Sequence, residues 1–141
     1  MLNNRSITLE LLGTFDIYTG IFIQIMFALF LGILIGVDRE KKRKPAGIKT
    51  NVMICLGATL YTSISLLNVP PPGIPYDPNR IAAQIVSGIG FLGAGAIMRG
   101  GGNVSGLTTA ATIWVVAALG VVIGFGFPII AVGATLIVLT V

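Results

Sequence analysis

Long apolar runs alternate with short polar breaks along the 141 residues of this chain. A helix rises about 1.5 Å per residue, so about 20 residues cross a hydrocarbon core about 30 Å thick. Five runs approach that length, and the chain ends inside the fifth. The pattern therefore predicts an all-α, polytopic transmembrane helical bundle of about five spans, at residues 20–37, 51–69, 78–98, 106–124 and 127–141.

Proline, glycine and capping residues mark where the predicted helices begin and end. The run Pro-Pro-Pro-Gly at 70–73 cannot continue a helix. Asp77 followed by Pro78 predicts the start of the third span, since proline suits the first helical position. Thr50 and Ser105 are the predicted N-caps of the second and fourth spans.

Composition agrees with a protein that lies mostly in lipid. Hydrophobic residues make up 55% of the chain, charged residues 10%, and mean hydropathy is +0.96, whereas a soluble domain carries about 25% charge. The chain has no His, which excludes a Ser-His-Asp triad and His-ligated zinc or haem. Its single cysteine excludes an internal disulfide and a cysteine cluster for metal. We therefore predict no enzyme and no cofactor.

The basic residues predict the orientation in the membrane. A cytoplasmic loop at 38–50 places seven of the nine Lys and Arg residues inside, the group being Arg39, Lys41, Lys42, Arg43, Lys44, Lys49 and Arg99. The N-terminus is then outside and the C-terminus cytoplasmic. Residues 1–19 are predicted to be an extracytoplasmic or interfacial segment with no cleaved signal peptide, and 20–141 the transmembrane domain. The net charge of +4 is explained by topology, so the lipid bilayer is a predicted partner and nucleic acid is not.

Polar side chains recur at helical spacing in three of the spans and predict faces turned toward protein. The third span has an isoleucine-rich opposite side, predicted to face lipid. Two interpretations of the polar faces stay open: close packing with hydrogen bonds between helices, or a polar pathway or ligand cleft along the bundle. Their members are Asn51, Cys55, Thr62, Arg80, Gln84, Ser87, Thr109 and Thr112.

Glycines at similar spacing predict close contacts between helices. These contacts predict a homo-oligomer, a dimer first of all, although the same faces can equally be used within one protomer. The predicted packing glycines are Gly32, Gly36, Gly88, Gly95, Gly120 and Gly124.

The densest group of charges follows the first span, and it contains two acids that topology does not require. These acids can pair with neighbouring cations, bind Mg²⁺, dock a partner or simply stay solvated, and the identity of any metal is left open. The group comprises Asp38, Arg39, Glu40, Lys49 and Thr50. An outer pair, Asp77 and Arg80, is interpreted as a helix cap with an interfacial anchor.

Three segments, residues 31–51, 77–99 and 104–126, resemble the MgtC/SapB family, and the similarity extends over roughly residues 23–141. Asp38, Arg39 and Glu40 match the family's acidic pair and arginine, and Asp77 with Arg80 match its D-x-x-R pair. Ala46, Gly47, Lys49 and Thr50 match its loop motif. Asp38 stands where glutamate is usual and Lys49 where arginine is common, which keeps the charges but not bidentate geometry.

The resemblance implies a multi-pass protein of the bacterial inner membrane, linked to growth in low magnesium and to survival inside host phagocytes. It implies a regulator of membrane physiology that binds membrane proteins such as F-type ATP synthase, and not a magnesium transporter. Many family members carry a further cytoplasmic C-terminal domain. We therefore expect a non-enzymatic inner-membrane regulator; the alternative is a small ion or solute channel or transporter formed by an oligomer.

Overall fold

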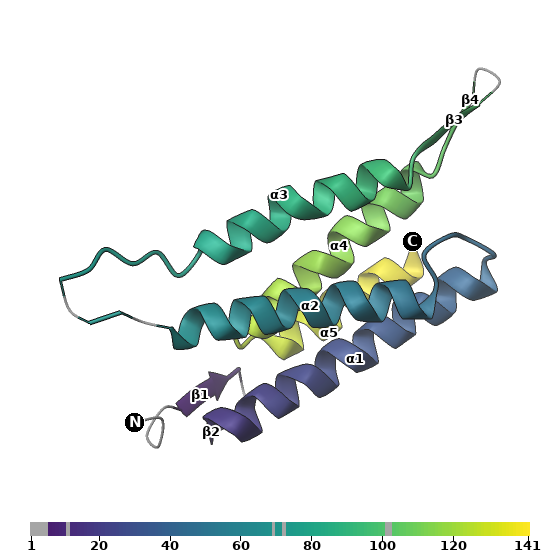
Figure 1. Ribbon diagram of the computed structural model, residues 1–141. Helices are drawn as coiled ribbons and strands as arrows, with labels where there is room; N and C mark the ends of the chain where they lie inside the picture. The colour runs from purple at the N-terminus through teal and green to yellow at the C-terminus, as the bar shows by residue number, and fades with distance from the viewer. Residues whose placement is uncertain (1–5, 11, 69, 72, 101–102) are drawn as a thin grey trace.

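Five helices, running alternately up and down, form the body of the computed structural model (Figure 1). It describes residues 6–10, 12–68, 70–71, 73–100 and 103–141. The helices are α1 (Ile17–Lys41), α2 (Ile48–Leu67), α3 (Arg80–Gly95), α4 (Leu107–Gly124) and α5 (Pro128–Thr140). Two short hairpins join them, β1 (Ser6–Leu9) with β2 (Gly13–Asp16), and β3 (Met98–Gly100) with β4 (Asn103–Ser105). The predicted all-α membrane fold is confirmed.

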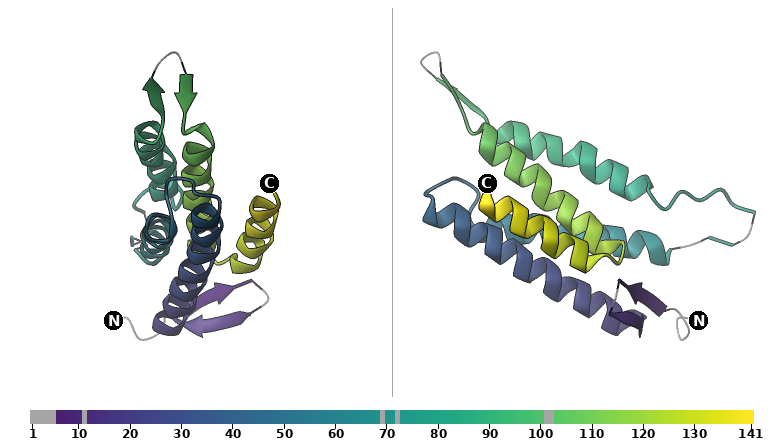
Figure 2. Two further views of the ribbon diagram at one scale, coloured as in Figure 1. Left: turned by 90° about the vertical axis from the view of Figure 1, so that its right-hand side faces the viewer. Right: turned by 180° about the vertical axis from the view of Figure 1, so that it is seen from behind.

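The ends of the helices gather at two ends of the molecule (Figure 2). The first hairpin, the segment between α2 and α3 and the α4–α5 turn lie at one end. The loop between α1 and α2, the second hairpin and the C-terminus lie at the other. The basic loop and the C-terminus thus share an end, as the predicted orientation requires; the orientation itself stays a prediction.

Helix length separates the five helices into two groups. Within the described residues, α1, α2 and α4 are long and apolar enough to cross a membrane. The apolar helices α3 and α5 have 16 and 13 residues, which corresponds to about 24 and about 20 Å. These two helices are therefore shorter than a full hydrocarbon core about 30 Å thick.

The N-terminal residues form a hairpin that leads directly into α1. β1 and β2 pair antiparallel, with Ser6 opposite Asp16 and Leu9 opposite Gly13, and Leu9 is only 1% exposed. The Asp16 carboxylate then accepts hydrogen bonds from the Tyr18 and Thr19 amides at 3.1 and 3.2 Å. Because this cap closes the first turn, α1 begins at Ile17 and not at the predicted residue 20.

The other predicted helix starts were misplaced by one to three residues. The N-cap of α2 is Gly47, so Thr50 lies inside the first turn. The N-cap of α4 is Gly106, with φ +88°. Glycine suits this position because that conformation is unfavourable for a residue with a Cβ, and a Cβ there would overlap the Ala96 carbonyl group. The Asp77 carboxylate accepts a hydrogen bond from the backbone amide of Asn79 at 2.9 Å. This bond holds a turn before the helix, so α3 begins at Arg80. α3 also ends at Gly95, since residues 98–100 pair with 103–105.

Close packing of α1, α2 and α4 makes the centre of the bundle, and four of the predicted glycines explain how. A Cβ on Gly32 would lie 2.8 Å from the Val52 Cα, and one on Gly36 would lie as close to the Ile48 backbone nitrogen. Gly120 and Gly124 of α4 approach α2 in the same way. These contacts all lie within one chain. In contrast, nothing lies within 4 Å of a Cβ built on Gly88 or Gly95, so these two glycines make no close helix contact here.

Candidate functional site

The polar residues of α2 and the start of α4 lie inside the bundle. Asn51, Cys55, Thr62 and Thr109 are all buried. Thr112 is half-buried and donates to the Thr108 carbonyl of its own helix at 2.8 Å. Four members of the predicted polar group therefore face protein, and what they do depends on their hydrogen bonds.

A buried network of hydrogen bonds ties α1, α2 and α4 together, and Gln24 is at its centre. Its amide nitrogen donates to the Gly124 carbonyl at 3.2 Å, and its amide oxygen accepts from the Ser63 hydroxyl at 2.8 Å. The Thr59 hydroxyl donates to the Gly120 carbonyl at 3.0 Å. Gln24 was not among the predicted polar residues. The signal that could have found it is an amide alone in an apolar run, since such a group in lipid needs a protein partner.

The predicted charged group after the first span divides into buried and exposed parts. Arg39 is only 7% exposed, and its Nη2 donates to the Thr109 hydroxyl at 2.6 Å and to the Pro45 carbonyl at 3.3 Å. Its Nε is buried without a hydrogen-bond partner among the described residues. Lys49 and Thr50 are exposed. Arg39 therefore fastens the loop between α1 and α2 to the first turn of α4.

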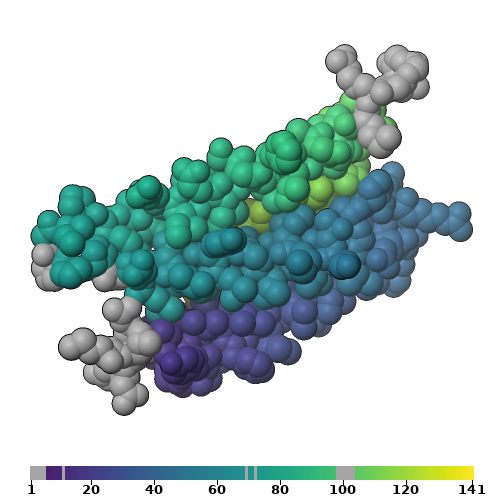
Figure 3. All heavy atoms as spheres, in the orientation of Figure 1, coloured from purple at the N-terminus to yellow at the C-terminus, as the bar shows by residue number. Residues whose placement is uncertain are grey.

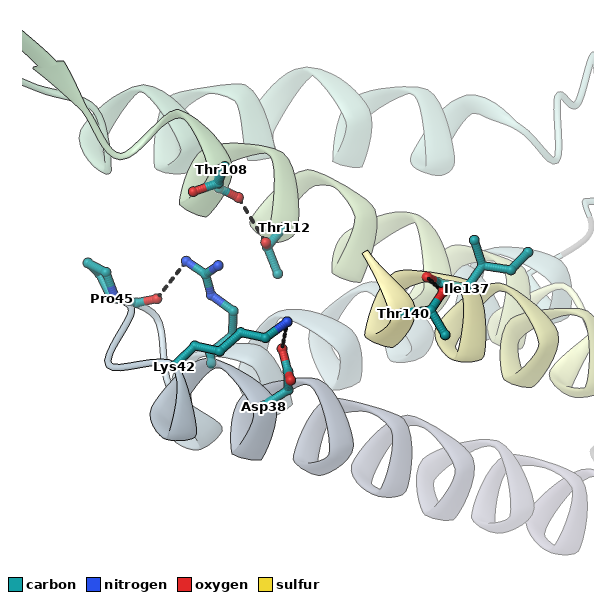
Figure 4. A network of polar contacts seen from close by, with 8 residues as sticks. Asp38, Lys42, Pro45, Thr108, Thr112, Ile137 and Thr140 are labelled. Atoms are coloured by element: carbon teal, nitrogen blue, oxygen red, sulfur yellow. Dashed lines mark hydrogen bonds and ion pairs between the residues drawn. The ribbon is translucent and has the colours of Figure 1, made fainter.

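The two acids of this group have separate partners. Asp38 forms an ion pair with Lys42, 3.1 Å between Oδ2 and Nζ, at the end of α1 (Figure 4). The Glu40 carboxylate accepts from the Ile48 amide at 2.9 Å and so closes the start of α2. In the part of the chain that the structure describes, no three Cys, Asp or Glu side chains come together as metal ligands. Glu40 thus has a structural task that sequence analysis did not anticipate.

Asn51 completes this end of the bundle. Its amide nitrogen donates to the Ala46 and Gly47 carbonyls at 2.5 and 2.9 Å. Its Oδ1 is buried without a hydrogen-bond partner among the described residues. Ala46 has φ +60°, a conformation that costs energy for a residue with a Cβ. The amide of Asn51 holds the loop in that shape.

α3 turns the opposite way from the prediction. Arg80, Gln84 and Ser87 are exposed, and Phe91, four residues after Ser87, is 82% exposed. Ile89 packs instead against α4, on Ile113 and Ala117. α4 therefore packs on the isoleucine side of α3, through van der Waals contacts and not through the polar face. The outer pair is also separate: the Asp77 carboxylate binds the Asn79 amide, and the described residues show no ion pair to Arg80.

Comparison with known proteins identifies the family. The profile of the MgtC family matches residues 25–141. The chain belongs to the MgtC family. "Protein MgtC" of Salmonella typhimurium (strain LT2) is 47% identical over 117 residues, which are 83% of this chain and 48% of that protein. An "Uncharacterized protein" of Haemophilus influenzae is 42% identical over 144 residues, 98% of this chain and 60% of that protein.

A third relative carries magnesium in its name. "Putative magnesium transporter YhiD" of Escherichia coli (strain K12) is 44% identical over 110 residues, 74% of this chain and 50% of that protein. The chain therefore spans about half the length of these curated MgtC-family relatives, and up to 60% of the Haemophilus protein. No solved structure matches it. The family and the helical bundle together identify a membrane protein of the MgtC family.

Proposed function

We propose that this chain is the membrane domain of a non-enzymatic, magnesium-related protein of the bacterial inner membrane, which acts by binding another membrane protein. Membership of the MgtC family supports the membrane location. The name of the Escherichia coli relative supports the link to magnesium. An F-type ATP synthase is the kind of partner that the resemblance implies.

The observation that carries this proposal is how the buried polar groups are used. A route for ions through one protomer needs polar groups that line a water-filled space. Gln24, Thr59 and Ser63 are instead buried and bound to one another or to carbonyl groups of neighbouring helices. Such groups fasten helices together, which favours the packing interpretation and a regulator over a channel within the protomer.

The proposed lack of enzymatic activity follows from the available side chains. The single thiol, Cys55, is buried between helices. Of the two acids nearest the basic loop, Asp38 is paired with Lys42, and Glu40 accepts a hydrogen bond from the backbone amide of Ile48. Such groups are poorly placed to act as nucleophile or general base.

Self-association as a dimer stays part of the proposal, with one change. Gly32, Gly36, Gly120 and Gly124, the glycines first expected to make the dimer, have their contacts within one chain. A dimer must therefore use another surface of the bundle.

Two assays test the proposed function. The chain and its Asp38→Asn/Glu40→Gln variant are expressed in a bacterium that lacks its own MgtC relative, and growth is measured in low magnesium. We expect the chain to restore growth and the double variant to fail while still reaching the membrane; Lys44→Gln, an exposed neighbour, is the matched control. Full growth of the double variant contradicts a functional role for these acids.

The second assay measures flux of Mg²⁺, K⁺ and H⁺ in liposomes that contain the purified protein. The regulator proposal expects no flux above that of protein-free liposomes. Flux that Gln84→Leu abolishes overturns the proposal in favour of an oligomeric channel, because Gln84 lies on the exposed face of α3. Folding of each sample is checked by circular dichroism.

A further inference from the structure

The surface between α2 and α3 is hollowed along much of its length (Figure 3). One hollow, of about 610 Å³, has almost entirely apolar walls. Met53, Gly57 and Tyr61 of α2 form one side, Ile85 and Gly88 of α3 form the other, and Ala117 of α4 lies in the floor. None of the residues that the structure describes fills this space. Its volume lies within the range of about 300–1,000 Å³ that is typical of ligand sites.

A second hollow of about 600 Å³ adjoins the first, and Ile81 and Gln84 line both. It lies where α2 ends and α3 begins, and its walls include Ser65, Asn68 and Arg80. The two hollows therefore form one slot that is apolar along the helices and polar at the end of the bundle. We call it the α2–α3 slot.

Two glycines keep the α2–α3 slot open. Nothing lies within 4 Å of a Cβ built on Gly57 or on Gly88. Both glycines line the apolar hollow, one from each helix. Side chains at these positions would narrow the slot without touching the rest of the protein.

Charge favours an anion at the polar end. Arg80 is exposed there, and no ion pair to it occurs among the described residues. Asp77 lines the same hollow, but its carboxylate accepts from the Asn79 amide at 2.9 Å. A guanidinium at the membrane surface with no acid bound to it attracts phosphate oxygens, which it can bind in bidentate fashion.

We propose that the α2–α3 slot binds one anionic glycerophospholipid. An acyl chain lies in the apolar hollow between Gly57 and Gly88, and the phosphoryl group lies at the polar end beside Arg80. Gln84, at the junction of the two hollows, donates its amide to the ester region of the lipid. A side-chain amide exposed to hydrocarbon finds no hydrogen-bond partner in the lipid tails, and a bond to the lipid ester gives the Gln84 amide a partner.

A second copy of the chain fits the slot less well than a lipid does. A copy would need to bring an acid to Arg80. At the same end of the molecule, Asp16 already caps α1, and the Glu10 carboxylate accepts from the Ile130 amide at 3.3 Å. Asp77 also lies at this end, and its carboxylate already accepts from the backbone amide of Asn79 at 2.9 Å. The remaining two described acids, Asp38 and Glu40, lie at the opposite end of α1. A lipid supplies both the apolar chain and the negative charge.

Native mass spectrometry of the purified, delipidated chain in detergent tests the proposal. The protein is titrated with phosphatidylglycerol, phosphatidylcholine and diacylglycerol. We expect one phosphatidylglycerol per chain, bound about tenfold more tightly than diacylglycerol, which lacks the phosphate that Arg80 contacts, and also more tightly than phosphatidylcholine, whose choline cation is repelled by Arg80. Arg80→Gln should remove that preference and leave residual binding of both phospholipids.

Gly88→Leu should weaken binding of every lipid by about tenfold or more, because the new side chain fills the apolar hollow. The matched control is Gly133→Leu, since Gly133 is exposed on α5 and has nothing within 4 Å of its Cβ position. Gly57→Leu repeats the test from the opposite wall in case the first variant does not fold, which circular dichroism reports.

Three results overturn the proposal. The first is undiminished binding of phosphatidylglycerol by folded Gly88→Leu or Gly57→Leu. The second is equal binding of diacylglycerol and phosphatidylglycerol with no effect of Arg80→Gln. The third is a dimer of the chain that Gly88→Leu or Gly57→Leu dissociates, because a second copy of the chain would then be the occupant of the α2–α3 slot. The proposed regulatory function is tested separately by growth, so either proposal can fail alone.

Discussion

Gly120→Ala is the sharpest test of how the centre of the bundle is held together. A Cβ at this position would overlap the Cys55 carbonyl oxygen and would lie 2.7 Å from the Ala58 Cβ. The obstacle is backbone of α2 and not the end of a flexible side chain, so α4 must move away from α2. The same movement stretches the bond from the Thr59 hydroxyl to the Gly120 carbonyl, now 3.0 Å.

The size of the effect follows from three contributions. Overpacking a well-packed contact costs about 1–3 kcal/mol. A weakened interhelical hydrogen bond in a membrane protein adds about 0.6 kcal/mol. Alanine favours a helix over glycine by about 1 kcal/mol, which offsets part of the loss. We expect Gly120→Ala to lower the free energy of unfolding by about 0.6–2.6 kcal/mol.

The assay is unfolding in mixed micelles by increasing fractions of sodium dodecyl sulfate, followed by far-ultraviolet circular dichroism. Gly133→Ala is the matched control, because Gly133 also lies within a helix but nothing is within 4 Å of its Cβ position. It should be neutral or stabilise by up to about 1 kcal/mol. Equal stability of Gly120→Ala and Gly133→Ala would refute the packing argument.

Three further predictions concern polar contacts. Gln24→Leu should lower the free energy of unfolding by about 0.6–2 kcal/mol in the same assay, because the Ser63 hydroxyl and the Gly124 carbonyl each lose a hydrogen-bond partner. Gln84→Leu, at an exposed position, should leave the free energy of unfolding unchanged. Arg39→Lys should raise the rate of trypsin cleavage within residues 41–44 about fivefold. The shorter lysine side chain does not carry a donor to the position of Nη2, the nitrogen that binds Pro45 and Thr109, which is a loss of about 1 kcal/mol. Arg43→Lys should leave the cleavage rate unchanged. Hydrogen bonds from the Thr19 hydroxyl and backbone amide lower the pKa of Asp16. The Asp16 cap on α1 is therefore fully present above the ordinary carboxyl pKa and is lost as the pH falls through the lowered value. Hydrogen exchange of the Thr19 amide should become faster over that interval, and Asp16→Asn should abolish this pH dependence.

The apolar runs were sufficient to predict the helices, since a single long apolar segment satisfies its own backbone groups in lipid only as a helix. Their ends were harder. Asp77 followed by Pro78 has the composition of a helix start, yet the Asp77 carboxylate binds the Asn79 amide and delays the helix to Arg80. Local composition does not tell which of two nearby amides a carboxylate will bind.

The direction of helix faces depends on partners far away in the chain. Gln84 and Ser87 have the same spacing as the buried polar residues of α2, but α4 packs on the isoleucine side of α3. Gln24 was missed for a related reason, because its partners lie 39 and 100 residues away. Spacing within one helix identifies a face, and only the three-dimensional arrangement tells what covers it.

The network around Gln24 has a consequence for how the protein is made. Gln24 and Ser63 belong to the first two helices and can pair as soon as α2 has entered the membrane. The Gln24 amide nitrogen must wait for the Gly124 carbonyl, which the ribosome adds 61 residues after Ser63, after the whole of α3. At about 5–20 residues per second that interval is about 3–12 s. During it, the nascent α1–α2 pair exposes polar groups that only a later helix covers, so the insertion machinery has a physical reason to retain the pair until α4 arrives.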